Sequence, residues 1–497
     1  MEFTGYFLPA LILFPILINR LAKHFPRLLL SPVLLLSPII FVYLTGFSFY
    51  LHEPIELTLY QFSTYFSLGV RLDVLSGLIA MTVSTIGAVV VRYSVRYLED
   101  DPKRIQFQRN LSYTLSFVLF MLMSPNLLLF FAAWTGTSYF LHQLLTHFSQ
   151  RDGALRAARQ KFWVSRLGDV FILSSGAVLF FVFKSLEFQT LFLAVKNPTI
   201  LAENAFLINL ASLLLVFGAM TKSAQFPFHY WLPRTMETPT PVSAIMHAGI
   251  INAGGYLVIR MSPILATTPV ALSVLALVGG FTAFFGTLVM FAQTNVKKSL
   301  AYSTIAQMGF MMLQCGLGAF SIATVHIVGH AFYKAYAFLS SGTATDFGKL
   351  NRYFPKVNSE SPFGIVLILG LSSVAFFWGT LHYLNSNILN ESGVAILLLV
   401  LALAGSQIII NSKKNIDGVS MVILIAGLYI GLSASVKFLL GGSVAAQVAG
   451  EGLLRNSTFA ICASLFVGLY FIQNSLDKIS ATKIGKRVYV RALKGGF

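Results

Sequence analysis

The sequence predicts an all-α polytopic membrane protein, and three observations lead to this fold class. Of the 497 residues, 56% are hydrophobic and only 11% are charged, whereas about a quarter of the residues in a soluble domain are charged. The mean hydropathy is +0.75. The apolar residues occur in blocks of about 20, the length that an α-helix needs to cross the hydrocarbon core. Together these features exclude a water-soluble globular protein.

The hydrophobic blocks predict about 14–15 transmembrane helices when they are read with a window of about 19 residues. The intervening segments are too short to hold a second folded domain. In chain order, the candidate spans lie near residues 6–21, 28–50, 71–91, 111–124, 126–148, 162–184, 205–225, 240–260, 269–292, 299–318, 320–342, 362–384, 393–412, 416–440 and 454–474.

The distribution of lysine and arginine predicts the orientation, because these residues accumulate in cytoplasmic loops. With the N-terminus outside and the C-terminus cytoplasmic, most of the 35 lysines and arginines fall on the inner side, and Lys161 is placed there in a loop. Five exceptions lie on the predicted outer side, namely Arg71, Lys184, Lys196, Arg260 and Arg455. Three more lie within spans, namely Lys222, Lys334 and Lys437. The net charge of +17 is therefore explained mostly by the lysines and arginines of the cytoplasmic loops. Nucleic-acid binding is a weak alternative, since the cations are not gathered in one patch.

Three ionisable residues follow one another in the span near 320–342. His326, His330 and Lys334 are four residues apart, so they share one face of an α-helix. Ionisable groups inside a membrane usually mark an ion or proton path, and histidine changes charge near neutral pH. A zinc site is a weaker alternative, because no glutamate and no third ligand accompany the two histidines. Histidines hydrogen-bonded between packed helices are the other alternative.

A second polar site begins at Lys222. An apolar span reaches this lysine, and Pro227, Pro233, Pro239 and Pro241 follow it, so the helix is expected to break just after Lys222. Broken helices at membrane depth line cavities and mark transport sites. A lysine that snorkels to the cytoplasmic surface is the alternative interpretation.

Two further polar residues, His247 and Asn252, lie among glycines that permit close helix packing. They could continue a polar line from Lys222 toward His326, and an interhelical hydrogen bond explains them almost as well. Cys315 and Cys462 both lie in apolar runs, which predicts buried thiols with neither a disulfide nor a metal cage. We expect no metal site in this chain.

Four motifs resemble the antiporter-like proton-translocating membrane subunits of respiratory complex I and of the Mrp cation/proton antiporters. They occupy residues 166–169 (R-L-G-D), 218–249 (which contains T-K-S-A-Q-F-P-F-H), 297–310 (K-K-S-L-A-Y-S-T-I-A-Q-M-G-F) and 330–335 (H-A-F-Y-K-A). The resemblance implies two inverted five-helix repeats, each with a discontinuous helix. The implied divisions are N-terminal helices at 1–110, a first repeat at 111–260, a second repeat at 269–412, and C-terminal helices with a basic tail at 413–497.

The resemblance also implies roles for particular residues. Lys222 would be the central lysine of the first half-channel, and the connecting polar axis would contain His247, Lys298, His326, His330 and Lys334. Arg166, Asp169, Glu237 and Asn252 would support this path. Two positions depart from the family pattern. Thr135 stands where a glutamate usually follows tryptophan, and His382 is the nearest substitute for the lysine of the second broken helix.

The short chain, the run at 246–255 and the segment around 141–169 are similar to the membrane subunit of the dissolved-inorganic-carbon accumulating (DAB-type) complex. This resemblance implies a bacterial inner-membrane subunit that couples a proton or sodium gradient to CO2 and bicarbonate accumulation. The implied partner is a large soluble carbonic-anhydrase-like subunit on the cytoplasmic face, which would hold zinc, while this chain would hold no cofactor and would not be catalytic alone. Two alternatives stay open: a proton-pumping subunit of an NADH-quinone oxidoreductase-type complex, and a cation/proton antiporter subunit.

Overall fold

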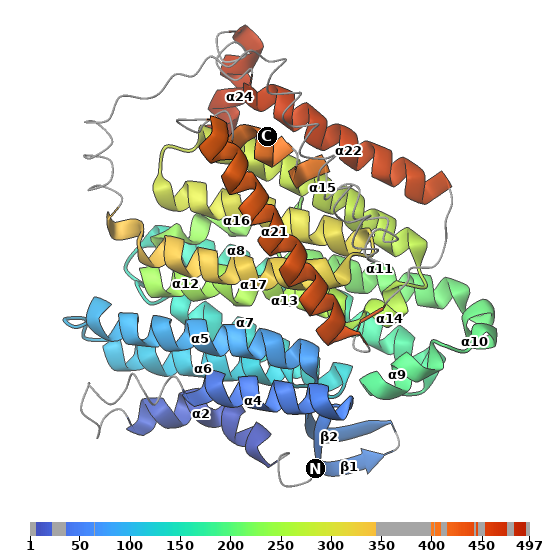
Figure 1. The fold of residues 1–497 in the computed structure, drawn as a ribbon. Coiled ribbons are helices and arrows are strands. Elements are labelled where there is room, and N and C mark those ends of the chain that lie inside the picture. The colour runs from blue at the N-terminus through green and yellow to red at the C-terminus, as the bar shows by residue number, and fades with distance from the viewer. Residues whose placement is uncertain are drawn as a thin grey trace.

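The computed structural model describes residues 6–21, 36–63, 65–343, 399–401, 403–408, 415–441, 444–445, 453–474 and 482–493. Over these residues the chain is predominantly helical, with one two-stranded antiparallel sheet. The long helices run side by side, and the hairpin of β1 and β2 lies at one end of the bundle near the N-terminus (Figure 1). The predicted all-α membrane fold is confirmed.

The helices and strands fall into three groups along the chain. The N-terminal part contains α2 (Phe7–Leu21), α4 (Leu36–Leu51), β1 (Ile55–Ser63), β2 (Phe66–Leu72), α5 (Val74–Tyr97) and α6 (Arg104–Leu122). The central part contains α7 (Leu127–Leu145), α8 (Asp152–Phe183), α9 (Phe188–Ala194), α10 (Pro198–Glu203), α11 (Ala205–Lys222), η1 (Phe228–Trp231), η2 (Pro233–Glu237), α12 (Thr240–Ala248), η3 (Ile250–Asn252) and α13 (Ala253–Arg260). The remaining elements are α14 (Ser262–Leu265), α15 (Pro269–Ala292), α16 (Val296–Gly316), α17 (Phe320–Leu339), η4 (Ser341–Thr343), α21 (Asn415–Leu440), α22 (Leu453–Asn474) and α24 (Lys483–Leu493).

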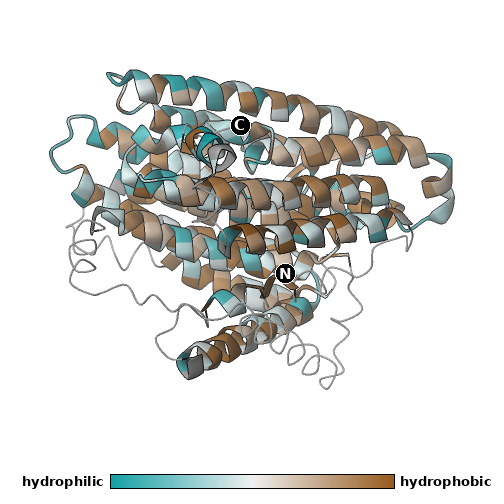
Figure 2. Cartoon of the chain, turned by 90° about the horizontal axis from the view of Figure 1, so that it is seen from above, coloured by the Kyte–Doolittle hydropathy of each residue, from teal (hydrophilic) through white to brown (hydrophobic). Residues whose placement is uncertain are grey.

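Seven helical segments of the described chain are long and apolar enough to cross a membrane. They are Val74–Tyr97, Asp152–Phe183, Ala205–Lys222, Thr240–Arg260, Pro269–Ala292, Asp417–Leu440 and Leu454–Gln473. The helices α6, α7, α16 and α17 pack among them, and apolar residues extend along most of the helical ribbons (Figure 2). The total of 14–15 spans and the inverted-repeat layout stay predictions. The candidate span at 362–384, with His382, lies outside the described residues.

The predicted helix break after Lys222 is confirmed. The helix α11 ends at Lys222, and Ala224 adopts a left-handed backbone with φ 48°. The proline-rich segment then forms two short 3-10 helices before α12 starts at Thr240. Because proline has no backbone N–H and clashes with the preceding turn, this segment cannot continue the α-helix.

A second break, which the sequence analysis did not predict, lies between α12 and α13. The 3-10 turn η3 separates them, although both belong to one apolar segment. Gly254 at the start of α13 lies against Ala219 O and Ser223 Oγ, so a Cβ at this position would clash with α11. The missing side chain therefore lets α13 pack directly on the helix end that carries Lys222.

An ion pair ties three elements together at the hairpin end of the bundle. Asp73 caps the N-terminus of α5 by accepting a hydrogen bond from Ser76 N at 2.9 Å, and it accepts another from Arg260 Nη2 at 2.9 Å. Arg260 Nη1 also contacts the second carboxylate oxygen. Tyr256, which bonds to Arg260, donates to Leu122 O at 2.7 Å. The ends of α5, α6 and α13 are thereby joined. Arg260 is buried at this predicted outer end and does not project into solvent.

We expect Asp73→Asn to destabilise the protein by about 3–5 kcal/mol, because it leaves the buried Arg260 charge without its partner. The measurement is the thermal unfolding of the purified protein in detergent. Lys196→Gln, which removes an exposed cation lining the same cavity as Asp73 and Arg260, should leave the transition unchanged. Equal stability of Asp73→Asn and the unmodified chain would show that the pair does not anchor the bundle.

Candidate functional site

Lys222 is buried at the end of α11, and within the described residues its side chain makes its polar contacts with α7. Its side chain has 5% exposure. Lys222 Nζ donates to Ser138 Oγ at 2.8 Å and to Trp134 O at 3.4 Å, and it lies 4.3 Å from the centre of the Trp134 ring. Across the residues that the structure describes, no carboxylate lies within ion-pair distance of this ammonium. Neutral oxygens and an aromatic face therefore solvate the lysine.

Close packing of α8 on α11 keeps Lys222 enclosed. A Cβ at Gly168 of α8 would clash with the hydroxyl of Thr221, which is the residue before Lys222. A Cβ at Gly218 would come within 2.6 Å of Ile172 on α8. The two glycines let the helix backbones approach closely, so side chains at this depth are shielded on the α8 side.

The predicted supporting pair Arg166 and Asp169 lies on the other side of Trp134. Trp134 Nε1 donates to Asp169 Oδ1 at 3.1 Å, and Arg166 Nη2 lies 2.7 Å from Asp169 Oδ2. Trp134 therefore touches Lys222 with its ring and the buried carboxylate with its N–H. The resemblance implied that Arg166 and Asp169 support the path, and in the structure the pair meets Trp134, which contacts Lys222.

Thr135 occupies the position where the family usually has a glutamate, and it does not contact Lys222. Its hydroxyl donates within α7, to Ala132 O at 2.8 Å. Ser138, one turn further along α7, makes the contact with the lysine instead. The sequence analysis missed Ser138. Its spacing of four from Trp134 was the available signal, because residues four apart share a helix face.

His247 connects α12 to the second group of polar residues. It is fully buried, its Nδ1 lies 2.9 Å from Thr304 Oγ1 on α16, and its ring stacks on Phe338 of α17 at 4.3 Å. Its Nε2 has no hydrogen-bond partner among the described residues. Asn252, also buried, donates to Ala248 O at 2.7 Å, while its Oδ1 is unpartnered in the same part of the chain. Two buried polar atoms beside the second helix break are thus unpaired.

The residues predicted to share one face of α17 form a buried line. His326 Nδ1 lies 3.0 Å from Gln314 Oε1, the rings of His326 and His330 are 6.2 Å apart, and Lys334 Nζ donates to Leu300 O at 3.0 Å. Neither ring nitrogen of His330 has a partner among the described residues. Because α12 packs on α17, His247 comes within electrostatic range of His330 and Lys334. Four of the predicted axis residues are thereby brought together.

Lys298 and Glu237 lie outside this buried line. Lys298 is exposed in the first turn of α16, where Asn295 caps the helix by accepting from Lys298 N at 3.1 Å. Its neighbour Lys297 reaches Thr240 Oγ1 at 3.1 Å. Glu237 is also exposed, and its side chain lies beside Gly153 at the start of α8. The helix-start position keeps Lys298 at the end of the bundle, so the structure does not bring it to the axis.

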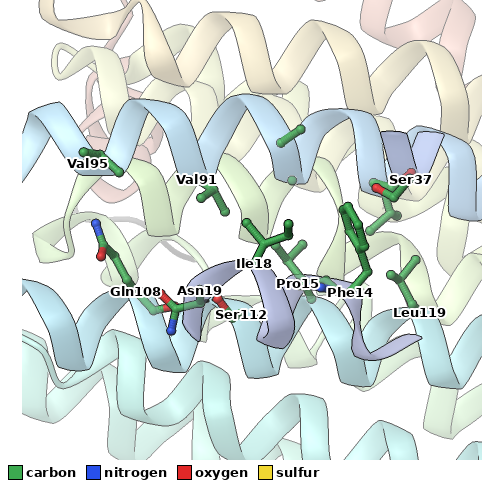
Figure 3. A pocket seen from close by; sticks show the side chains of 15 residues that line it. Phe14, Pro15, Ile18, Asn19, Ser37, Val91, Val95, Gln108, Ser112 and Leu119 are labelled. Carbon is green, nitrogen blue, oxygen red and sulfur yellow. Dashed lines mark hydrogen bonds between the residues drawn. The ribbon is translucent and has the colours of Figure 1, made fainter. Parts of the chain in front are cut away.

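A small cavity between α2, α5 and α6 is not a candidate site. Its volume is about 40 Å³, and its lining is mostly apolar with a few uncharged polar side chains such as Asn19, Gln108 and Ser112 (Figure 3). None of its lining residues is ionisable. Elsewhere in the described ranges, no three histidine, cysteine, aspartate or glutamate side chains could jointly hold a metal ion. The free thiols Cys315 and Cys462 are buried, as predicted.

Comparison with known families supports the motif-based interpretation. A family model described as "NADH:quinone oxidoreductase/Mrp antiporter, TM" matches residues 124–410. The chain belongs to this antiporter family. A second model, described as the chain 5 N-terminus of NADH-ubiquinone oxidoreductase (complex I), matches residues 61–108. The protein is therefore a multi-pass membrane protein of the antiporter-like family.

Several relatives cover most of the chain. The probable inorganic carbon transporter subunit DabB2 of Halothiobacillus neapolitanus is 39% identical over 352 residues, which is 70% of this chain and 62% of the relative. The chloroplastic NAD(P)H-quinone oxidoreductase subunit 5 of Physcomitrium patens is 32% identical, over 68% of this chain and 50% of its own length. The chain thus spans about half to two thirds of the curated relatives it matches.

Two solved structures share the fold. The Mrp complex from Dietzia sp. DQ12-45-1b matches with a TM-score of 0.66 and 21% identity, over 99% of this chain and 59% of that chain. The membrane-bound sulfane sulfur reductase, an archaeal respiratory membrane complex, matches with a TM-score of 0.59 and 17% identity, over 98% of this chain and 97% of that chain. At these identities the similarity concerns the fold alone.

We expect Thr304→Val to slow ion translocation about tenfold, because it leaves His247 Nδ1 buried without its hydrogen bond. Thr304→Ser keeps the hydroxyl and should retain most of the rate. The measurement is the rate of pH change in vesicles that contain the protein. If the valine and serine variants transported equally well, the contact between His247 and Thr304 would be a packing contact only.

Proposed function

We propose that this chain translocates protons or sodium ions through the path from Lys222 to Lys334. The observation that carries the proposal is the burial of Lys222, at a helix break, among neutral partners. An ionisable group inside a membrane is costly, so such residues are rare and usually have a function. Lysine can also lose its charge when its surroundings change, whereas arginine does not. Lys222 can therefore alternate between a charged and a neutral state as its surroundings shift.

The polar groups beyond Lys222 supply the next positions of the path. His247 and His330 both have unpartnered ring nitrogens in the described structure, and an imidazole can accept a proton on one nitrogen and release one from the other. Lys334 ends the line, buried against Leu300 O. The two helix breaks, after Lys222 and between α12 and α13, provide non-helical backbone of the kind that lines transport sites.

We propose that this ion flow is coupled to inorganic carbon accumulation by a soluble partner. The support is the similarity to three proteins named as probable inorganic carbon transporter subunits, DabB2 and DabB1 of Halothiobacillus neapolitanus and DabB of Hydrogenovibrio crunogenus. The partner would be a large carbonic-anhydrase-like subunit on the cytoplasmic face, and zinc would belong to that partner. The chain would lie in a bacterial inner membrane with its N-terminus outside.

The second candidate function is ion pumping in a quinone oxidoreductase-type complex or in a multi-subunit cation/proton antiporter. It is favoured by the similarity to chloroplastic NAD(P)H-quinone oxidoreductase subunit 5 and by the Mrp fold. Both candidates use the same buried path, and they differ in the proteins that accompany the chain.

Lys222→Ala and Lys222→Arg should both abolish ion translocation while the protein still assembles in the membrane. Alanine removes the ionisable group, and arginine keeps a charge that it cannot release. The measurement is ion-driven pH change in membrane vesicles that contain the full chain and its partners. Lys184→Ala, which removes an exposed lysine, is the matched control. Transport by Lys222→Ala at the unmodified rate would overturn the assignment of the path.

Affinity purification of the tagged chain in mild detergent should recover a large soluble protein that contains zinc. Mass spectrometry identifies the partner, and a metal assay measures the zinc. Recovery of several small membrane subunits, or of flavin and iron-sulfur proteins, would reject the carbon-accumulation proposal and support the second candidate function.

A further inference from the structure

A second buried lysine lies beside Lys222. The sequence analysis placed Lys161 in a cytoplasmic loop, and the structure corrects this: Lys161 lies within α8 with 3% exposure. Its Nζ donates to Ser138 O at 2.8 Å, while Lys222 Nζ donates to Ser138 Oγ, also at 2.8 Å. Two lysines from different helices thus bind the carbonyl and the hydroxyl of one serine on α7.

An open cavity lies between α7 and α8 next to Lys161. Its volume is about 480 Å³. Its polar lining consists mainly of Thr135, Ser138, His142, Lys161, Ser165 and Arg166. Lys222 does not line it. Lys161 and Ser138 both line the cavity, and Ser138 binds the enclosed Lys222.

Charges around the two lysines leave them poorly compensated. From α8 itself, Asp169 and Arg166 face Lys161, but these two already form an ion pair. The partly buried His142 on α7 faces Lys161, and so does Lys222 on α11. On the packed segment η2, Glu237 lies beside Gly153, two turns away along α8. In the described part of the chain, no free carboxylate neutralises two ammonium groups at Ser138, so they repel one another.

We propose that Lys161 is the access residue of the ion path, which takes up protons from the cavity and, when charged, drives the proton of Lys222 onward. The inference rests on the proposed function of Lys222. In the first step the Lys161 amine accepts a proton from water in the cavity and becomes an ammonium. Its charge favours loss of the Lys222 proton toward the His247 side, which leaves Lys222 as a neutral amine. The Lys161 ammonium then turns from the Ser138 carbonyl to the Ser138 hydroxyl, which accepts its proton while donating its own to the neutral Lys222 amine, and Lys161 is neutral again.

The test compares Lys161→Met with Lys161→Arg in vesicles that contain the full chain and its partners. Both variants should slow transport at least about tenfold. Methionine removes the repelling charge, so Lys222 keeps its proton to higher pH and the midpoint of the pH–rate profile rises. Arginine holds a permanent charge, so the midpoint falls. Arg159→Met, which removes an exposed cation from the same helix, should change neither quantity.

Opposite shifts of the two midpoints would support the proposal, since a merely structural role for Lys161 would move both variants alike. An unmodified rate and profile in Lys161→Met, or shifts in one direction, would overturn it. Loss of transport in Lys222→Ala with normal transport in Lys161→Met would reject this inference and leave the proposed function intact.

A second measurement tests the cavity even if the Lys161 variants fail to fold. Ala132 is an exposed residue of the cavity lining, and the native thiols Cys315 and Cys462 are buried. A maleimide should therefore modify Ala132→Cys selectively and reduce its transport, with no effect on the unmodified chain. Complete labelling of Ala132→Cys without loss of transport would show that the cavity does not supply Lys222.

Discussion

The solvation of one buried lysine by α7 determines much of the structure around it. An ammonium group taken out of water must find replacement partners, and Lys222 finds them in the Ser138 hydroxyl, the Trp134 carbonyl and the Trp134 ring. These contacts require α11 to end beside the middle of α7. They also require α8 to pack closely enough to exclude solvent, which the glycines at 168 and 218 permit.

A lysine held by neutral groups differs functionally from one held in an ion pair. A carboxylate in direct contact would stabilise the charged form and resist release of the proton. The buried carboxylate of Asp169 is separated from Lys222 by Trp134 and is already paired with Arg166. With threonine at position 135, the charges close to Lys222 are those of the Asp169–Arg166 pair and of Lys161, which is bound to the same serine.

The hairpin end of the bundle serves stability. There the pair of Asp73 and Arg260, together with Tyr256, joins the ends of three helices. The polar side-chain atoms of the pair have hydrogen-bond partners. The polar line through His247, His330 and Asn252 contains several atoms without partners in the described residues. Fully satisfied polar networks make a structure rigid, whereas a buried polar atom without a protein partner can bind a water molecule or an ion. The molecule therefore combines a fully paired anchor with a buried polar line, for which we propose a role in proton transfer.

Sequence alone determined the helical membrane class, the helix end at Lys222 and the shared face of His326, His330 and Lys334, because these depend on composition, proline positions and helix periodicity. The motifs also indicated the family, which the model matching residues 124–410 established. The sequence did not reveal the break between α12 and α13, the exposed position of Lys298 or the burial of Lys161. Whether a lysine near a helix end meets water or a serine on another helix depends on how the helices pack. Only the tertiary structure decided that Ser138 joins two lysines, since its partners lie 23 and 84 residues away in the chain.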